Sequence, residues 1–266
     1  MKDIPKLGFG TYGRTGDAGI AALEKALEVG YRHLDTAQSY DTEKEVGAAV
    51  RNSGLARDDV WITTKIDMAN YGPGKLAPSL EASIERLGLT PNLTLLHWPS
   101  PNGELPLEVY LDQIVEAKAR GLTGEIGVSN FPIALLKSAI SRAGEGQILT
   151  NQFEVNPLHN NHKLARFCQS VGVLVTCYLP IAKGRLAGEP TAEAIAARHG
   201  ATVEQIALAW ELAKGYAAIP TSSRADRIAS NFAARDVTLS AEEISALDAL
   251  PQQARAIDPD WGPDWD

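Results

Sequence analysis

Short apolar runs alternate along the chain with longer segments whose apolar residues recur at helical spacing. The runs predict eight strands, at residues 6–11, 32–36, 60–65, 93–98, 125–129, 148–152, 173–179 and 217–221. The segments between and after them predict helices at residues 18–29, 43–53, 76–87, 107–120, 132–142, 163–171, 191–198, 203–214, 224–233 and 241–250. The pattern is therefore strand–helix repeated along the whole chain.

Local start and stop signals support several of these helices. Asp17 precedes the first helix as a candidate N-cap, and Gly30 follows its end, where a left-handed residue closes many helices. Ser240 and Glu243 have the spacing of a capping box. Gly200 is expected to close another helix at His199.

This alternation, over 266 residues without a composition break, predicts an α/β protein that is one domain, residues 1–266. Eight strands with helices between them is the count of a closed (β/α)8 barrel, the TIM barrel. An open doubly wound sheet also alternates, but it normally uses fewer strands per domain. Apolar residues make up 44% of the chain, enough for a sizeable core, which argues against intrinsic disorder.

The charge balance limits the partners. The chain has 25 Lys+Arg and 33 Asp+Glu, a formal net charge of −8, which disfavours general binding to nucleic acid or to anionic membranes. No run approaches 18 uninterrupted apolar residues, so no membrane span is expected. The two cysteines, Cys168 and Cys177, cannot build a disulfide framework, and together with the absence of a signal-like N-terminus they predict a cytoplasmic protein.

Gly8 to Gly13 match the G-x-G-x-x-G pattern of dinucleotide-binding Rossmann units, with Asp35 ending a following strand. Two features disfavour that interpretation. The apolar run before Gly8 is short and contains Pro5, and the next helix is expected to begin near Asp17, too late for Gly13 to open its first turn. A glycine-bearing strand end is the simpler explanation.

Four chemically active residues stand at or just after the ends of three successive strands. Asp35 ends the second strand and Tyr40 follows in the next loop, Lys65 ends the third strand, and His97 lies near the end of the fourth. In a parallel barrel these positions share the rim that carries the active site. Each alone has an ordinary structural explanation, but Asp and Lys are costly to bury together unless they pair.

The set suits the reduction of a carbonyl group. Hydride transfer to carbon leaves negative charge on oxygen, which needs a proton and a positive environment. The ordinary tyrosine pKa is about 10, and the Lys65 ammonium is expected to lower the pKa of Tyr40 while Asp35 holds the lysine. Neutral His97 would hold the substrate oxygen near Tyr40. This scheme needs no metal.

With these residues the sequence resembles the aldo-keto reductases over essentially its whole length, through Asp35-Thr-Ala-Gln-Ser-Tyr40, Thr63-Thr-Lys65 and Leu96-His-Trp-Pro99. It is most similar to the short bacterial branch of 2,5-diketo-D-gluconate reductases, which also reduce methylglyoxal. The resemblance implies a monomeric barrel oxidoreductase that uses NADPH, with Tyr40 as proton donor, Lys65 and Asp35 as its tuning pair, and His97 as the carbonyl-orienting residue.

The resemblance also assigns binding residues. Those expected at the nicotinamide are Ser129, Asn130, Gln152 and, stacked on the ring, Tyr178. Those expected at the pyrophosphate and adenosine end lie in residues 179–186 and 219–231, and the second range includes Ser222, Ser223, Arg224, Arg227 and Asn231. Thr221 stands where many relatives have lysine, which leaves NADH use open. Substrate contacts are expected from Tyr12, Trp98, His97 and Trp261, around an open pocket for small polar carbonyls.

Three other interpretations remain. His159 and His162, with Cys168 and Cys177, suggest a metal site, although the cysteines are not clustered. A cofactor-binding but catalytically silent, nucleotide-sensing subunit is a second, which the filled catalytic positions disfavour. A phosphate-binding isomerase or lyase on the same barrel is a third.

Overall fold

In the computed structural model, which describes residues 4–266, eight parallel strands form one sheet in sequence order. The strands are β1 (Phe9–Gly10), β2 (His33–Asp35), β3 (Trp61–Ile66), β4 (Leu93–Leu96), β5 (Glu125–Ser129), β6 (Ile148–Glu154), β7 (Leu174–Tyr178) and β8 (Ala217–Ala218). Leu7 pairs in parallel with Ala218, and the Gly8 amide donates to the Ala218 carbonyl at 2.9 Å, so the last strand meets the first. The predicted (β/α)8 barrel is confirmed, and the open doubly wound sheet is excluded.

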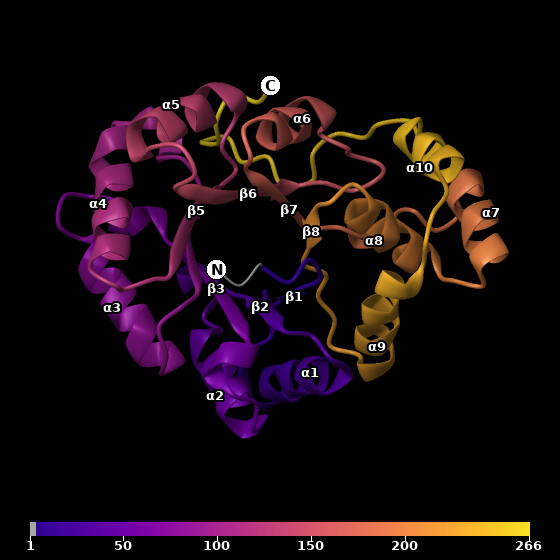
Figure 1. Cartoon of the computed structure of the whole chain (residues 1–266), viewed down its shortest axis with the longest axis horizontal. Helices are drawn as coiled ribbons and strands as arrows, with labels where there is room; N and C mark the ends of the chain where they lie inside the picture. The colour runs from indigo at the N-terminus through magenta and orange to yellow at the C-terminus, as the bar shows by residue number, and fades with distance from the viewer. Residues whose placement is uncertain (1–3) are drawn as a thin grey trace.

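The helices form a ring around the strands (Figure 1). They are α1 (Gly16–Val29), α2 (Glu43–Asn52), α3 (Leu76–Leu87), α4 (Leu107–Ala119), α5 (Ile133–Ala143), α6 (His162–Ser170), α7 (Pro190–His199), α8 (Val203–Ala213), α9 (Ala225–Ala233) and α10 (Ala241–Asp248). Short 3₁₀ helices follow four of the strands: η1 (Gln38–Tyr40), η3 (Met68–Asn70), η4 (Pro101–Gly103) and η5 (Ala182–Gly184). Two more follow helices: η2 (Arg57–Asp59) after α2 and η6 (Ala234–Asp236) after α9. None of the helices in residues 4–266 has the length and apolar character needed to cross a membrane.

Most of the predicted helix start and stop signals are observed, and one is wrong. Ser240 and Glu243 form the expected capping box, and Gly30 and Gly200 close their helices with positive φ. Asp17 is not the N-cap of α1, because the helix begins at Gly16 after Thr15. Asp17 instead lies in the first turn, where its negative charge interacts favourably with the positive end of the helix dipole.

The first and last strands are much shorter than predicted, and local geometry explains why. Gly8 lies so close to His33 that a Cβ at this position would be 2.5 Å from the imidazole ring. The backbone just before β1 is therefore in close contact with the first residue of β2. Pro220 has no amide hydrogen, so the ladder of β8 cannot continue through it. The Gly8–Gly13 motif therefore contains the two-residue strand β1, and Gly13 forms a left-handed turn ahead of α1.

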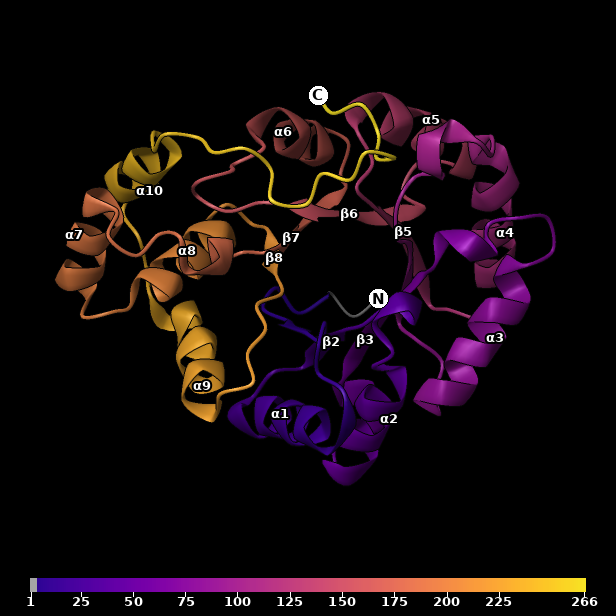
Figure 2. The same ribbon diagram turned by 180° about the vertical axis from the view of Figure 1, so that it is seen from behind.

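The chain after α10, residues 249–266, is called the C-terminal segment below. It runs past β7 and β6 and ends beside α5 (Figure 2). The Asp266 side chain accepts a hydrogen bond from the Ile133 amide at 2.9 Å, at the start of α5. The Trp261 carbonyl accepts from the Asn102 amide at 3.1 Å, in the loop after β4. The segment is therefore fixed to the loops that follow the strands, the end of the barrel where active sites form.

Candidate active site

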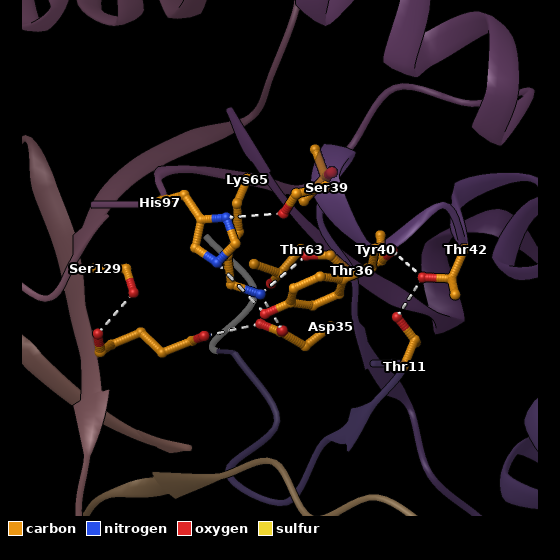
Figure 3. Close-up of polar contacts among 12 residues, drawn as sticks. Thr11, Asp35, Thr36, Ser39, Tyr40, Thr42, Thr63, Lys65, His97 and Ser129 are labelled. Atoms are coloured by element: carbon orange, nitrogen blue, oxygen red, sulfur yellow. Dashed lines mark hydrogen bonds and ion pairs between the residues drawn. The ribbon is translucent and has the colours of Figure 1, made fainter. Parts of the chain in front are cut away.

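A buried ion pair lies at the centre of the site. The Lys65 ammonium, on β3, hydrogen-bonds to Asp35 Oδ1 at the end of β2 and donates to the Thr36 carbonyl at 2.9 Å (Figure 3). Both side chains are buried. Gln152 Nε2, from β6 across the barrel, donates to Asp35 Oδ2 at 2.8 Å. Each carboxylate oxygen of Asp35 therefore has a donor, which offsets the cost of burying its charge.

Tyr40 reaches this pair from η1, the short helix between β2 and α2. The Lys65 ammonium lies 4.8 Å from the centre of the Tyr40 ring. The Tyr40 hydroxyl is 3.5 Å from His97 Nε2, and His97 Nδ1 is 3.3 Å from Ser39 Oγ (Figure 3). The four residues predicted from strand ends are therefore brought together, with tyrosine and histidine facing the same space.

The protonation states differ in one respect from the prediction. Burial raises the pKa of Tyr40 above its ordinary value, and the opposing effect of Lys65 does not cancel it. The expectation that Lys65 brings the pKa of Tyr40 below its ordinary value is therefore wrong. Burial acts to lower the pKa of Lys65, but Asp35 and Tyr40 raise it above the ordinary value, so the lysine stays charged. Burial and Lys65 lower the pKa of His97 to about 3, which keeps the imidazole neutral.

Polar amide groups form the wall next to this centre. Asn130 follows β5 with a φ of 63°, and its Nδ2 donates to the His97 carbonyl at 3.1 Å. The Tyr178 hydroxyl donates to Asn130 Oδ1 at 2.9 Å, and Ser129 Oγ donates to the Gln152 carbonyl at 2.8 Å. The four residues predicted to hold a nicotinamide thus form one connected wall from β5, β6 and β7.

One cavity, of about 420 Å³, joins these groups. The predicted residues that line it are Tyr12, Asp35, Tyr40, His97, Trp98, Ser129, Asn130, Gln152 and Tyr178. Tyr12 stands at its mouth, 70% exposed, with its ring edge-on to Tyr40. Trp261 is not on the wall but packs edge-on behind Trp98, with 5.2 Å between ring centres.

The two ranges predicted for the pyrophosphate and adenosine end border the cavity at Leu179, Lys183, Ile219 and Thr221, whereas the five residues named between 222 and 231 do not line it. Arg224 and Arg227 are exposed at the start of α9, and Arg224 forms an ion pair with Asp226 at 2.5 Å. Ser222 Oγ accepts from the Arg224 amide at 3.1 Å. The remaining members are Ser223, which is exposed, and Asn231, which is buried on α9.

The suggested metal ligands lie elsewhere and serve other contacts. His159 Nδ1 is 3.0 Å from the Gln253 carbonyl, and His162 faces Asp248. Cys168 and Cys177 are buried free thiols. Within residues 4–266 no group of three or more His, Cys, Asp or Glu side chains is arranged to hold a metal ion.

Comparison with known proteins decides the family. Residues 6–252 match the family model described as Aldo/keto reductase family. The chain belongs to this family. The reductase is 42% identical over 265 residues to a methylglyoxal reductase DkgB of Yersinia pestis and 41% identical to that of Escherichia coli O157:H7, with 99% of each chain covered. As a member of this family it is an NAD(P)H-dependent oxidoreductase.

Solved structures agree with this assignment. An aldose reductase from Schistosoma japonicum superposes with a TM-score of 0.90 at 32% identity, covering 96% of this chain and 91% of that one. An aldo-keto reductase from Bombyx mori, determined in complex with NADP, superposes with a TM-score of 0.87 at 31% identity, covering 96% and 92%.

Lys183 and Ile219 of the reductase line the cavity within ranges predicted for the cofactor but without an individual predicted role, and Gly10, Thr11 and Ile257 line it without having been predicted at the site. Lys183 follows Leu179 and Ala182, and all three have positive φ without being Gly or Asn, so the residue types at these positions did not signal a left-handed backbone. Ile257 lies in the C-terminal segment, where the sequence has no periodic pattern. Ile219 was placed in the last strand, and its position beside Gly10 was not foreseen.

Proposed function

We propose that this reductase converts small aldehydes and ketones, such as methylglyoxal and 2,5-diketo-D-gluconate, to alcohols with NADPH, and that Tyr40 donates the proton. The observation that carries the proposal is the neutral Tyr40 hydroxyl beside a buried Lys65–Asp35 pair at the wall of one cavity. The names of the relatives support the substrate class.

The residues present fit a nicotinamide dinucleotide. The wall offers a serine hydroxyl and two side-chain amides, whose donors and acceptors match those of a carboxamide, and the Tyr178 ring beside them offers a face for stacking. Lys183 lines the next part of the cavity and could pair with a phosphate. Arg224 and Arg227 would hold the 2′-phosphate of NADPH, which requires Arg224 to share its charge with Asp226.

When bound, the cofactor supplies a hydride to the carbonyl carbon. The protein handles the oxygen. Tyr40 transfers its proton to that oxygen, and the adjacent Lys65 ammonium stabilises the phenolate as it forms. Asp35 keeps Lys65 charged and in place. If Ser39 donates to His97 Nδ1, then His97 Nε2 carries the hydrogen and can donate it to the substrate oxygen.

The cavity favours a small substrate. Tyr12 and Trp98 supply aromatic walls, and Trp261 supports Trp98 from behind. A volume of about 420 Å³, part of which the nicotinamide would fill, leaves space for a few carbon atoms on the substrate side. We expect higher kcat/KM for glyoxals than for steroids, and the reverse order would contradict this choice of substrate.

The test is NADPH oxidation by the wild type and by Tyr40→Phe, across methylglyoxal, 2,5-diketo-D-gluconate and aromatic aldehydes, repeated with NADH. Loss of the proton donor is expected to lower kcat by about 10² to 10⁴-fold. Tyr31→Phe is the matched control, because it removes a buried hydroxyl that makes no hydrogen bond within residues 4–266. Wild-type turnover in Tyr40→Phe would refute the assignment, and cofactor binding without turnover in the wild type would favour a nucleotide-sensing subunit.

A further inference from the structure

A buried carboxylate outside the reacting groups holds the C-terminal segment to the barrel. Glu154 is the last residue of β6, and its side chain is completely buried. Its Oε2 accepts hydrogen bonds from the backbone amides of Ala256 at 2.9 Å and Ile257 at 3.2 Å. The adjacent Ile257 side chain lines the cavity, so this carboxylate determines where that wall lies.

The other oxygen of the same carboxylate faces the opposite wall. Glu154 Oε1 is buried and has no hydrogen-bond partner within residues 4–266. The cation beside it is Arg185, whose Nη2 lies 4.0 Å away. Arg185 is fixed to its own loop, since its Nε donates to the Ala182 carbonyl at 3.0 Å, and the same loop carries the cavity residue Lys183.

Glu154 therefore stands between two segments that are far apart in sequence and both border the cavity. A carboxylate removed from water needs compensating donors, and within residues 4–266 they come from those two segments: backbone amides on one side and a guanidinium on the other. If either segment moves, the burial of the same charge is less well compensated. The two walls are thus energetically connected through one side chain.

We propose that Glu154 is a positioning residue that fixes the substrate-side wall through Ala256 and Ile257 and the cofactor-side wall through Arg185. It acts through these segments, because it is not among the residues that line the cavity. This inference rests on the proposed function because its KM test uses methylglyoxal as the substrate. The measurements of NADPH affinity and amide exchange described below do not depend on turnover.

Three variants separate the two connections. Glu154→Gln retains an amide oxygen for the backbone N–H groups but loses the charge that faces Arg185, whereas Glu154→Met loses both. Arg185→Gln removes the guanidinium alone. Glu125→Gln is the control, because Glu125 is a mostly buried acid at the opposite end of the neighbouring strand β5, paired with Lys118 at 2.7 Å.

For Glu154→Met, the KM for methylglyoxal is expected to rise about tenfold while kcat stays within about twofold, since the lost interaction holds substrate without taking part in the proton transfer. Glu154→Gln should leave this KM within about twofold and weaken NADPH binding about threefold to tenfold. Arg185→Gln should weaken NADPH binding by the same factor, and the double variant Glu154→Gln/Arg185→Gln no further than either single variant.

Two measurements avoid turnover. NADPH affinity is measured by quenching of tryptophan fluorescence, and the exchange of the Ala256 and Ile257 amide hydrogens is measured in the cofactor-free enzyme. We expect faster exchange at both amides in Glu154→Met and wild-type exchange in Glu125→Gln. If the wild type reduces no aldehyde, the proposed function fails while these measurements still decide the position of the segment.

Three results would overturn the proposal. The first is an unchanged KM in Glu154→Met with wild-type amide exchange. The second is additive loss of NADPH affinity in the double variant. The third is that kcat falls in proportion to the loss of thermal stability in the Glu154 variants, as it does in Glu125→Gln. Glu154 would then contribute to general stability and not to the position of the two walls. If Glu154→Met does not fold, the Glu154→Gln and Arg185→Gln cycle decides alone.

Discussion

His33 should make this barrel sensitive to mild acid. Its ring is fully buried, with Nε2 3.0 Å from Thr63 Oγ1 and Nδ1 3.3 Å from the Pro5 carbonyl. Burial lowers the pKa of His33 to about 4, against which Asp35 has only a partial effect. Below pH 6.5 the unfolded chain binds a proton at this residue that the folded protein does not.

The sign and the size of the change in folding stability follow from this difference in proton binding. Because the folded pKa is the lower one, His33 does not reduce stability above pH 6.5, and stability falls as the pH drops from 6.5 to about 4. A difference of about 2.5 pH units at about 1.4 kcal/mol per unit corresponds to a loss of about 3 kcal/mol. Below pH 4 the loss from this residue is complete.

Urea unfolding followed by tryptophan fluorescence, at pH values from 7 to 4, measures the effect in the wild type and in His33→Gln. At pH 7 the variant gives the cost of replacing the ring. As the pH falls, the wild type should lose about 3 kcal/mol more than the variant, so the two curves should approach or cross. Parallel loss of stability from pH 7 to 4 would refute the reasoning, because it would show that His33 is protonated as easily in the folded state.

Three further outcomes are expected. Lys65→Met should lower the free energy of unfolding by about 3–5 kcal/mol in urea, because it leaves the Asp35 carboxylate buried without its cation. The kcat/KM for reduction should be flat from about pH 6 to 9, because His97 stays neutral and Tyr40 stays protonated there; an inflection near the ordinary histidine pKa would contradict this. Burial raises the pKa of Glu211 well above its ordinary value, and neither oxygen has a partner within residues 4–266. Glu211→Met should therefore stabilise the protein at pH 7 by about 1–3 kcal/mol, with a smaller gain below pH 4.5, and thermal unfolding at both pH values checks it.

The sequence was sufficient to place the four central residues because parallel strands share one direction. Once Asp35, Lys65 and His97 are assigned to strand ends, the barrel brings them to one rim whatever the exact length of each strand. The strands at residues 6–11 and 217–221 were predicted too long, yet this error moved none of these side chains. The placement of these side chains depended on where each strand ends and much less on where it starts.

The loops were harder to predict because their conformation depends on contacts distant in sequence. Lys183 reaches the cavity through left-handed backbone at Leu179 and Ala182, a conformation that neither residue type favours locally and that tertiary contacts must hold. Ile257 is placed by its amide on Glu154, 103 residues earlier in the chain. No periodicity or turn signal contains this information.

The pKa of Tyr40 shows that identifying two neighbouring residues does not establish the net pKa shift between them. Spacing identified Tyr40 and Lys65 as neighbours, but the net shift is the difference between two opposing effects, burial and an adjacent ammonium. Which of them prevails depends on how deeply the hydroxyl is buried, and that depth is a property of the folded cavity. Because the phenol is held neutral before the reaction, Lys65 has its effect as the phenolate forms. Its loss should therefore lower kcat and kcat/KM by the same factor, and a titration of Tyr40 in the resting enzyme would not report its contribution.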